Sequence, residues 1–449
     1  MSEFEVAELN PKIVIQKISD LRAFSGNART HSKKQLGQIA DSMKRFGFTN
    51  PVLVSEGLEI IAGHGRVEAA KMLGLEEVPT IALPHLSEAE RRAYILADNK
   101  LALNAGWDQE TLAIELQWLV DVDFEVELTG FSNLEIDLVL DSAGEASIIS
   151  DENPEDEIPA VQETAVSRSG DIWVLDHHKL LCGDARNQTG YDALFGSETA
   201  DIIFTDPPYN VTINGNVTGL GKQKHREFAM GSGEMTGDEF TLFLKETLGP
   251  AAQACRDGAI AYVCMDWRHI RELVEAGACV FDEYKNLVIW NKTNGGMGSF
   301  YRSKHELIGV FKIGTAAHTN NFGLGDTGRY RTNVWDYAGI SSMSATRDEE
   351  LKMHPTVKPV ALIADALRDC SKRGDIVLDC FGGSGSTLIA AQTTGRRARL
   401  IEYDPLYCDT IVRRWERFTG KQAKLRSNSQ SFDQCQHERC GIDGSEVGQ

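Results

Sequence analysis

The chain has 449 residues, a formal net charge of −20, a hydrophobic content of 42% and a charged content of 25%. This length exceeds what one hydrophobic core supports, so two or three domains are expected, with the composition of a soluble globular protein. The negative charge argues against a general polyanion binder, although net charge averages over local patches that decide binding.

Localisation and metal binding are constrained by what the chain lacks. No apolar run approaches the roughly 18 residues of a membrane span, and the N-terminus has no signal-peptide pattern. The nine cysteines have no framework spacing, which favours reduced thiols. Cys435 and Cys440 flank His437 without the ligand number and spacing of a metal site, so a polar tail is expected there. We therefore expect a cytoplasmic protein without membrane contact or metal.

The first region, residues 10–125, has the pattern of a small α/β domain. Two short strands flank a turn near residue 57 and lead into a glycine-rich turn, Gly63–Gly65, and a helix from about Val67. A second helix is expected to begin at Ser87, with Glu90 as its capping-box partner.

The next region, 126–167, is acidic, punctuated by proline and poor in aromatic residues, which is typical of a linker. Residues 168–422 then alternate apolar strands with helical stretches, which predicts a mostly parallel, doubly wound sheet. The final residues, 423–449, are expected to be a flexible tail. Eight strands are expected, within the segments 171–176, 178–184, 201–206, 259–265, 286–292, 306–312, 375–381 and 397–404.

The segment GDIVLDCFGGSGSTLIAAQTTGRRARLIEYD has the pattern of a cofactor cradle. A strand ends at Asp379, the turn from Phe381 through Gly383 to Gly385 opens a helix, and the next strand ends in Glu402, 20 residues past Gly382. An acid at that spacing binds ribose hydroxyls. Leu388 replaces the third glycine of a dinucleotide fingerprint, so S-adenosylmethionine, a nucleoside without pyrophosphate, suits the pattern better.

The stretch ADIIFTDPPYNV, 200–211, can be interpreted as a strand ending in a plain proline turn. Its position favours another interpretation. Asp206 ends its strand as Asp379 and Glu402 end theirs, and ligands bind beyond the carboxyl ends of parallel strands. We therefore expect Asp206, Pro207, Pro208 and Tyr209 to face the cofactor.

TDPPYN followed by DCFGGSGS resembles the amino-group DNA methyltransferases, in the motif order of their β class, over most of residues 168–420. The resemblance implies a Rossmann-like methyltransferase sheet, S-adenosylmethionine as cofactor and double-stranded DNA as partner. LLCGDA resembles the segment whose acid, here Asp184, contacts the cofactor adenine. HPTVKP resembles the segment beside the methionine end of the cofactor and contains Lys358.

In the resembling family the target is an exocyclic amine of a flipped base. Asp206 and the Pro207 carbonyl are expected to accept its two N–H groups, which localises the lone pair on nitrogen, while Pro208 helps to stiffen the loop. Tyr209 is expected to stack on the base. Aspartate at the first motif position favours adenine N6, because the cytosine-N4 enzymes more often have serine there.

Two segments between strands mix basic residues with glycine, which suits DNA-contacting loops. The residues expected to contact phosphates or guanine edges are Lys222, Lys224, Arg226, Arg329 and Arg331.

NARTHS, TNPVLV, GHGR and ILADNKL resemble the ParB-like N-terminal domain over roughly residues 10–120. The resemblance implies a nucleotide at the turn formed by Gly63, His64, Gly65 and Arg66, where a helix start and an arginine suit an anion. A DNA-binding, docking or dimerising role is the alternative, and a homodimer is compatible with it.

Three functions stay open at this point. The first is an adenine-N6 DNA methyltransferase with a ParB-like accessory domain. The second is a partition-like DNA-binding regulator whose methyltransferase domain is inactive. The third changes the substrate to cytosine N4 or to RNA. The intact Asp206, Tyr209, glycine turn and Glu402 favour the first, because an inactive site is expected to lose some of them.

Overall fold

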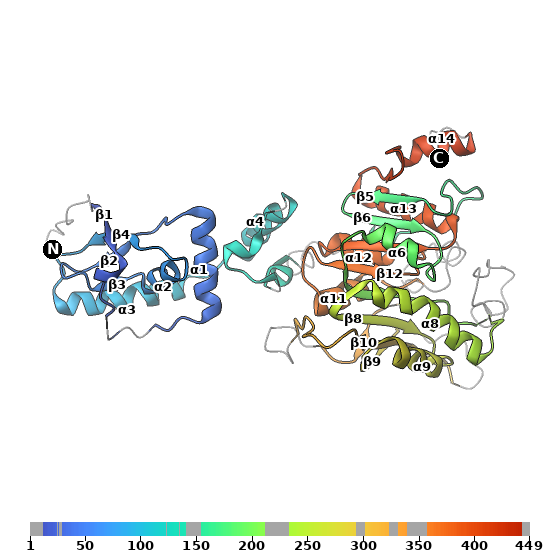
Figure 1. The fold of residues 1–449 in the computed structure, drawn as a ribbon, viewed down its shortest axis with the longest axis horizontal. Coiled ribbons are helices and arrows are strands. Elements are labelled where there is room, and N and C mark those ends of the chain that lie inside the picture. Colours follow the sequence, from blue (N-terminus) through green and yellow to red (C-terminus); the bar gives the residue numbers. More distant parts are fainter. Residues whose placement is uncertain are drawn as a thin grey trace. The chain divides into compact units, whose positions relative to one another are not determined.

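The computed structural model describes residues 12–24, 26, 29–122, 124–133, 135–140, 154–211, 233–292, 301–322, 331–338 and 357–441. The chain divides into two compact units, Met1–Ala146 and Ser147–Gln449 (Figure 1). This division falls within the segment expected to be a linker, 126–167.

The first unit is built on a four-stranded sheet with the order β1-β4-β2-β3. Its strands are β1 (Ile13–Lys17), β2 (Val52–Val54), β3 (Ile60–Ala62) and β4 (Glu77–Ala82). Its helices are α1 (Lys33–Phe46), α2 (His64–Met72), α3 (Glu88–Asn104) and α4 (Gln109–Asp121), with the short 3-10 turns Ile18–Asp20 and Val126–Thr129. The capping box expected at Ser87 and Glu90 is present at the start of α3.

The residues just after α4 do not form a linker. Val126 and Ile136 are buried against Leu112 and Leu116 of α4, and Phe131 packs at the edge of this cluster. Gln38 on α1 also donates a hydrogen bond to the carbonyl of Gly130. The acidic composition of this segment predicted a linker, but its few apolar residues are enough to form a small helical core.

The second unit is built on a ten-stranded sheet with the order β11-β9-β10-β8-β7-β12-β13-β6-β5-β14. Its strands are β5 (Ile172–Leu175), β6 (His178–Cys182), β7 (Ala200–Thr205), β8 (Cys255–Met265), β9 (Glu283–Asn291), β10 (His305–Lys312), β11 (Val334–Asp336), β12 (Ile376–Asp379), β13 (Arg397–Glu402) and β14 (Lys424–Leu425). The run β8-β7-β12-β13-β6 is parallel, whereas β10 pairs antiparallel with both β8 and β9. All eight expected strands are present, and the short strands β11 and β14 were not anticipated.

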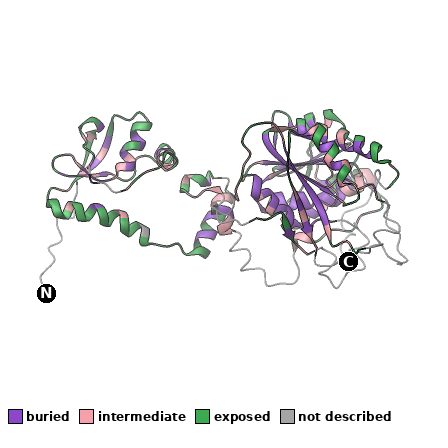
Figure 2. Ribbon diagram, turned by 90° about the horizontal axis from the view of Figure 1, so that it is seen from below, coloured by how far each residue is buried: buried purple, intermediate pink, exposed green. Residues whose placement is uncertain are grey.

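Helices cover both faces of this sheet, as a doubly wound fold requires. One face packs on α11 (Val360–Cys370), α12 (Ser386–Thr393) and α13 (Pro405–Thr419). The other packs on α6 (Gln188–Phe195), α8 (Gly237–Gln253) and α9 (Ile270–Val280). Figure 2 shows the central strands buried between these layers.

The expected flexible tail is instead packed onto the second unit as far as residue 441. The helix α14 (Phe432–Cys440) buries Phe432 and Cys435, and the Phe432 ring packs 5.2 Å from the Trp173 ring. Arg439 pairs with Asp171. Two apolar side chains at one face of a short polar helix therefore anchor a segment that looks flexible by composition.

Residues 154–167 also pack on the second unit, although their composition is that of a linker. Asp156, in the 3-10 turn Pro154–Asp156, accepts the backbone N–H of Val360 at 3.0 Å, and Asp409 accepts those of Val166 and Ser167 at 2.6 and 2.9 Å. These hydrogen bonds between carboxylates and backbone N–H groups hold the segment in place. The periodicity of apolar residues in the sequence cannot predict such bonds. Among the described residues, no helix combines the length and the apolar character needed to cross a membrane.

Candidate active site

Parallel pairing brings the motif strands to one edge of the large sheet. β12 lies between β7 and β13, with Val377 opposite Ile202 and Asp379 opposite Leu400. The residues that follow these strands therefore leave the sheet on the same side. Asp206, the glycine turn and Glu402 therefore lie at the same edge of the sheet.

Asp206 sits in a dense network of charged side chains at this edge. Its Oδ1 accepts the Tyr209 hydroxyl at 2.6 Å, and its Oδ2 accepts Lys358 Nζ at 2.6 Å. Lys358 Nζ also lies 2.9 Å from the Tyr209 hydroxyl and 3.0 Å from Oε2 of Glu306. Glu306 Oε1 in turn pairs with Lys292. Negative and positive side chains thus alternate along a row formed by Asp206, Lys358, Glu306 and Lys292. The Tyr209 hydroxyl contacts the first three of them.

The charges in this network set one another's pKa values. Burial alone would raise the pKa of Glu306, but Lys358 and Lys292 outweigh it and lower it to about 2. Burial also raises the pKa of Asp206, against the opposing effect of Lys358. For Lys358 burial would lower the pKa, yet Asp206 and Glu306 raise it. Lys358 therefore stays an ammonium, and its charge favours the ionised form of Asp206.

Asn210 fixes the backbone directly after the motif. It adopts a left-handed conformation, with φ at 53°, which asparagine tolerates better than most residues. Its Oδ1 accepts the N–H groups of Gly233 and Met235 at 3.1 Å each, and its Nδ2 donates to the Met235 carbonyl at 2.8 Å. The side-chain amide of Asn210 thus links the end of the motif to residues 233 and 235, which is a structural role.

Asp379 organises the glycine turn from below. Its carboxyl group accepts Thr205 Oγ1 at 2.8 Å, Thr387 Oγ1 at 2.7 Å and the N–H of Phe381 at 3.0 Å. Burial raises its pKa to about 7. Three of its acceptor positions are used within the chain, so the described contacts give Asp379 a role in shaping the turn. A contact with the cofactor stays a prediction.

Glu402 closes the other side of the turn. Its Oε2 accepts the N–H of Gly383 at 2.8 Å and its Oε1 that of Asp404 at 2.8 Å. Burial raises its pKa to about 7. A carboxylate has about four acceptor positions, so two of those on Glu402 stay open for hydroxyl groups.

The turn itself fits a closely approaching ligand. Gly383 and Gly385 have φ of 53° and 86°, and Gly385 is the N-cap of α12. A Cβ on Gly382 would lie 3.1 Å from Ile411 Cδ1, so side-chain volume here is limited. Phe381 packs 6.2 Å from the Phe243 ring at the edge of the core. Together with Glu402, these residues suit a nucleoside with a vicinal diol.

Asp184 follows β6, next to β13 in the sheet. Arg186 pairs with both of its oxygens, the shortest contact being 2.7 Å, and lowers its pKa. Asp184 is therefore ionised, as an acceptor for an amino group requires. The expected contact with adenine stays a prediction.

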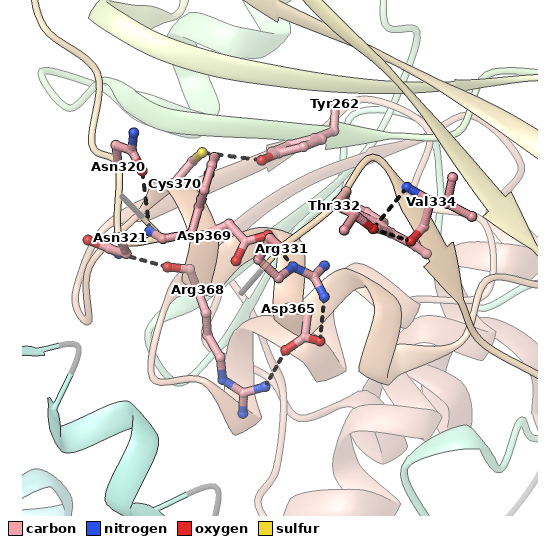
Figure 3. Close-up of polar contacts among 12 residues, drawn as sticks. Tyr262, Asn320, Asn321, Arg331, Thr332, Val334, Asp365, Arg368, Asp369 and Cys370 are labelled. Atoms are coloured by element: carbon pink, nitrogen blue, oxygen red, sulfur yellow. Dashed lines mark hydrogen bonds and ion pairs between the residues drawn. The ribbon is translucent and has the colours of Figure 1, made fainter. Parts of the chain in front are cut away.

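Arg331 is engaged within the protein. Its guanidinium pairs with Asp369 at 2.9 Å and Asp365 at 3.3 Å, and it lies 4.7 Å from the Trp335 ring centre (Figure 3). A DNA phosphate would have to break these ion pairs, so the geometry does not support the DNA contact expected for Arg331. The other four expected DNA-contacting residues, Lys222, Lys224, Arg226 and Arg329, lie outside the described residues.

The glycine-rich turn of the first unit lines a separate cavity of about 350 Å³. Gly63 caps α2 with φ of 102°, and a Cβ on Gly65 would lie 3.0 Å from the His31 ring. His64 Nε2 is buried without a hydrogen-bond partner. Arg66 instead donates to the backbone carbonyls of residues 50 and 51 at 3.0 and 2.8 Å, so its guanidinium supports the turn. The cavity also contains Arg29, Asp98 and Asn99.

Sequence reasoning missed Glu306 and Lys292 as site residues. Glu306 is the second residue of β10, a strand whose remaining residues are mostly apolar, and Lys292 follows β9. The position of Glu306, a carboxylate near the start of an otherwise apolar strand, was the sequence feature that could have indicated a site residue. Its partner could not be named, because Lys358 approaches from the start of α11. The described residues contain no cluster of metal-ligating side chains.

Comparison with known proteins follows the same division. Residues 5–100 match the ParB N-terminal domain, 110–169 the ParB-methyltransferase HTH domain and 200–413 the N6_N4_Mtase family, described as DNA methylase. The ParB-like nuclease domain-containing protein YnaK of Escherichia coli (strain K12) is 49% identical over 81 residues, which are 18% of this chain and 93% of that protein.

Two methyltransferases resemble the second unit. The type II methyltransferase M.HinfI of Haemophilus influenzae is 27% identical over 236 residues, which are 49% of this chain and 63% of that protein, so the chain spans under two thirds of its length. The crystal structure of the M1.HpyAVI-SAM complex is 20% identical, with a TM-score of 0.39, and the match covers 52% of this chain and 97% of that chain.

The hydrogen bonds of the Asn210 side-chain amide lead to a testable prediction. Asn210→Gly keeps the left-handed backbone but removes the amide, which should lower the free energy of unfolding by about 1–3 kcal/mol because three partly buried hydrogen bonds are lost. Asn210→Ala should lower it by about 1 kcal/mol more, because alanine is strained at this φ. Denaturant unfolding of the full chain measures both. Equal losses in the two variants would contradict the strain expected for alanine at this φ. No loss in either variant would contradict the stabilising role of the Asn210 amide.

Proposed function

Because the chain joins an N-terminal ParB domain and a ParB-methyltransferase HTH domain to an N6/N4 DNA methylase domain, we propose that it methylates the N6 amine of adenine in duplex DNA. Its membership of the amino-group DNA methylases makes S-adenosylmethionine the cofactor, and adenine is the finer part of the proposal. The observation that carries it is the carboxylate of Asp206, oriented beside the glycine turn and Glu402 at one sheet edge.

The chain's own residues would make a poor nucleophile reactive. The lone pair of an aromatic amine is delocalised into the base. Asp206 is bound at both oxygens, yet each keeps a second acceptor position for an N–H group. With the Pro207 carbonyl as the other acceptor, both hydrogens of the amine would be held and the lone pair directed. Such orientation by prearranged acceptors supplies much of an enzyme's rate enhancement.

The cofactor supplies an electrophilic methyl group when bound, and four parts of this chain suit it. Glu402 would hold the ribose hydroxyls, Asp184 the adenine amino group, and Phe381 and the glycines at 383 and 385 the approach of the nucleoside. Lys358, expected near the methionine end, has all three N–H donors directed at Asp206, Glu306 and Tyr209.

Tyr209, which is expected to stack on the base, is held by contacts within the protein. Its hydroxyl is bound to Asp206 and lies 3.2 Å from Glu306, and its ring packs partly against the core. One face of a half-buried ring can still stack on a flipped base, a contact worth about 1–3 kcal/mol. Duplex DNA is the proposed partner, through the HTH domain and the segments beside the site, because an acidic chain needs local contacts.

In the first unit, we propose that the cavity beside α2 binds a nucleotide. The start of a helix attracts anionic groups, and His64 Nε2 offers a buried group without a partner. Arg29 supplies a positive charge in the same cavity. A nucleoside phosphate satisfies all three features, and the cavity volume of about 350 Å³ is within the range of small-molecule sites.

The first prediction concerns the reaction. The full chain, incubated with labelled S-adenosylmethionine and mixed-sequence duplex DNA, should yield N6-methyladenine on nucleoside analysis. Asp206→Ala should lower kcat by at least about a hundredfold, because it removes the amine's charged acceptor, and leave the cofactor Kd within about threefold. Asp192→Ala, on the surface of α6, is the matched control and should keep activity.

Each alternative has its own result in this assay. N4-methylcytosine as the product would overturn only the adenine assignment. Methylated RNA without methylated DNA would overturn the duplex substrate. No methylated nucleoside with any DNA or RNA would favour a DNA-binding regulator and overturn the enzyme.

A second prediction concerns pH. Glu402 must be ionised to accept hydroxyl groups well, and its pKa is about 7, so protons compete with the cofactor below that pH. A group with that pKa is about nine-tenths protonated at pH 6 and about one-tenth at pH 8, so the cofactor Kd should rise about tenfold from pH 8 to pH 6. Calorimetric titration measures it. Glu402→Gln should bind weakly at pH 8 and lose most of the pH dependence, and an unchanged pH dependence would contradict this role.

The nucleotide prediction is tested by equilibrium binding of each of the four ribonucleoside triphosphates to the full chain. At least one should bind, and His64→Ala should weaken it about tenfold or more, since a hydrogen bond to a buried ligand atom is lost. Arg92→Ala is the control, because this arginine pairs with Glu88 on the surface of α3, away from the cavity. Binding that survives His64→Ala, or no binding at millimolar concentration, would overturn the proposal.

A further inference from the structure

Lys358 is saturated by side chains of the active site. An ammonium group has three N–H donors, and Lys358 Nζ directs them at Asp206 Oδ2 at 2.6 Å, the Tyr209 hydroxyl at 2.9 Å and Glu306 Oε2 at 3.0 Å. Its side chain is 3% exposed. Lys358 precedes Pro359, the N-cap of α11, so the helix start and the site are built from adjacent residues.

The second carboxylate has no evident task in binding the amine or the cofactor. Glu306 is buried, and Lys292 and Lys358 bind its two oxygens. The Trp290 ring lies 4.4 Å from Lys292 Nζ and 5.8 Å from Lys358 Nζ, so the two ammonium groups that bind Glu306 also contact one aromatic ring. Buried charges persist when each is paired, and here two positive and two negative charges balance.

We propose that Glu306 and Lys358 are positioning residues for methyl transfer: Glu306 holds Lys358, and Lys358 fixes the orientation and the negative charge of Asp206. Lys292 pairs with Glu306 and so offsets part of the repulsion between Glu306 and Asp206. This inference rests on the proposed function, because Asp206 is its acceptor for the amine. It differs from a cofactor contact of Lys358, which predicts other effects.

Geometry explains why Asp206 needs such help. Its side chain is 23% exposed and carries a charge that must accept an N–H group from a fixed direction. Tyr209 and Lys358 bind one oxygen each and so fix the plane of the carboxylate. Tyr209 is itself held through its contacts with Glu306 and Lys358. Removal of Lys358 would release both supports.

Electrostatics points the same way. The ionisable groups that face Asp206 are Lys358, Glu306 and Tyr209, together with the buried Cys264 thiol and the Asp379 carboxyl group. Burial and Glu306 raise the pKa of Asp206, and Lys358 lowers it. Without Lys358, two carboxylates would share a buried space, and one of them would hold a proton at neutral pH.

The test measures kcat against pH at saturating cofactor and DNA, with the cofactor Kd measured separately. Lys358→Met keeps the length of the side chain and removes its charge. We expect kcat at pH 7 to fall about tenfold to a hundredfold, and the acidic limb of the profile to move up by about one pH unit or more. The cofactor Kd should stay within about threefold. Lys421→Met, which breaks a surface pair with Asp176, is the control and should leave the profile unchanged.

Glu306→Gln supplies the opposite charge change at nearly constant shape. It should lower kcat, because Lys358 loses its second anchor, without moving the acidic limb upward. In the double variant, Lys358→Met with Glu306→Gln, the two carboxylates no longer repel each other. At least half of the upward shift caused by Lys358→Met should therefore be reversed, a coupling that a purely structural role would not produce.

Several outcomes would overturn the inference. They are an unmoved acidic limb in Lys358→Met, an upward shift that persists in full in the double variant, or a cofactor Kd raised more than tenfold with the profile unchanged. If Lys358→Met does not fold, Glu306→Gln decides, and unchanged kcat in that variant refutes the proposal. An inactive natural protein would instead refute the proposed function, which keeps the two failures distinct.

Discussion

The parallel pairing of β12 with β7 and β13 is the constraint on which the rest of the second unit depends. It aligns the carboxyl ends of three strands, so that Asp206, the glycine turn and Glu402 leave one edge together. Because β10 is antiparallel to β8, the start of β10 lies at the same edge, and this brings Glu306 close to Lys358. No single motif contains this site, because the site is a property of the sheet order.

Burial of charge is the second theme. The edge holds Asp206, Glu306, Lys358, Asp379 and Glu402 within a largely apolar domain, and each acid meets its own set of donors. Two lysines lower the pKa of Glu306 to about 2, whereas at Asp206 burial prevails over Lys358 and the pKa is raised. Asp379 and Glu402 have only N–H and O–H donors, and burial raises their pKa to about 7. One edge thereby keeps some acids charged and others sensitive to neutral pH.

Two arginines of the second unit are held by contacts within the protein. Arg331 is bound by Asp365 and Asp369, and Arg414 donates to the Glu155 carbonyl and to the Ser384 carbonyl beneath the glycine turn. These two arginines thus stabilise the fold, which leaves fewer basic side chains for the proposed DNA contact. Binding of this kind depends strongly on salt.

The sequence alone determined the eight main strands, the capped helix at Ser87 and the glycine turn followed by Glu402, because each is a local pattern of period, cap or spacing. The catalytic role of Asp206 stays a prediction. Tertiary structure decided what lies far apart in sequence: the pairing of Lys358 with Glu306, the commitment of Arg331 to two aspartates, and the packing of residues expected to be linker and tail. Those outcomes depend on which side chains approach from other elements, and a pattern within one element carries no record of its neighbours in space.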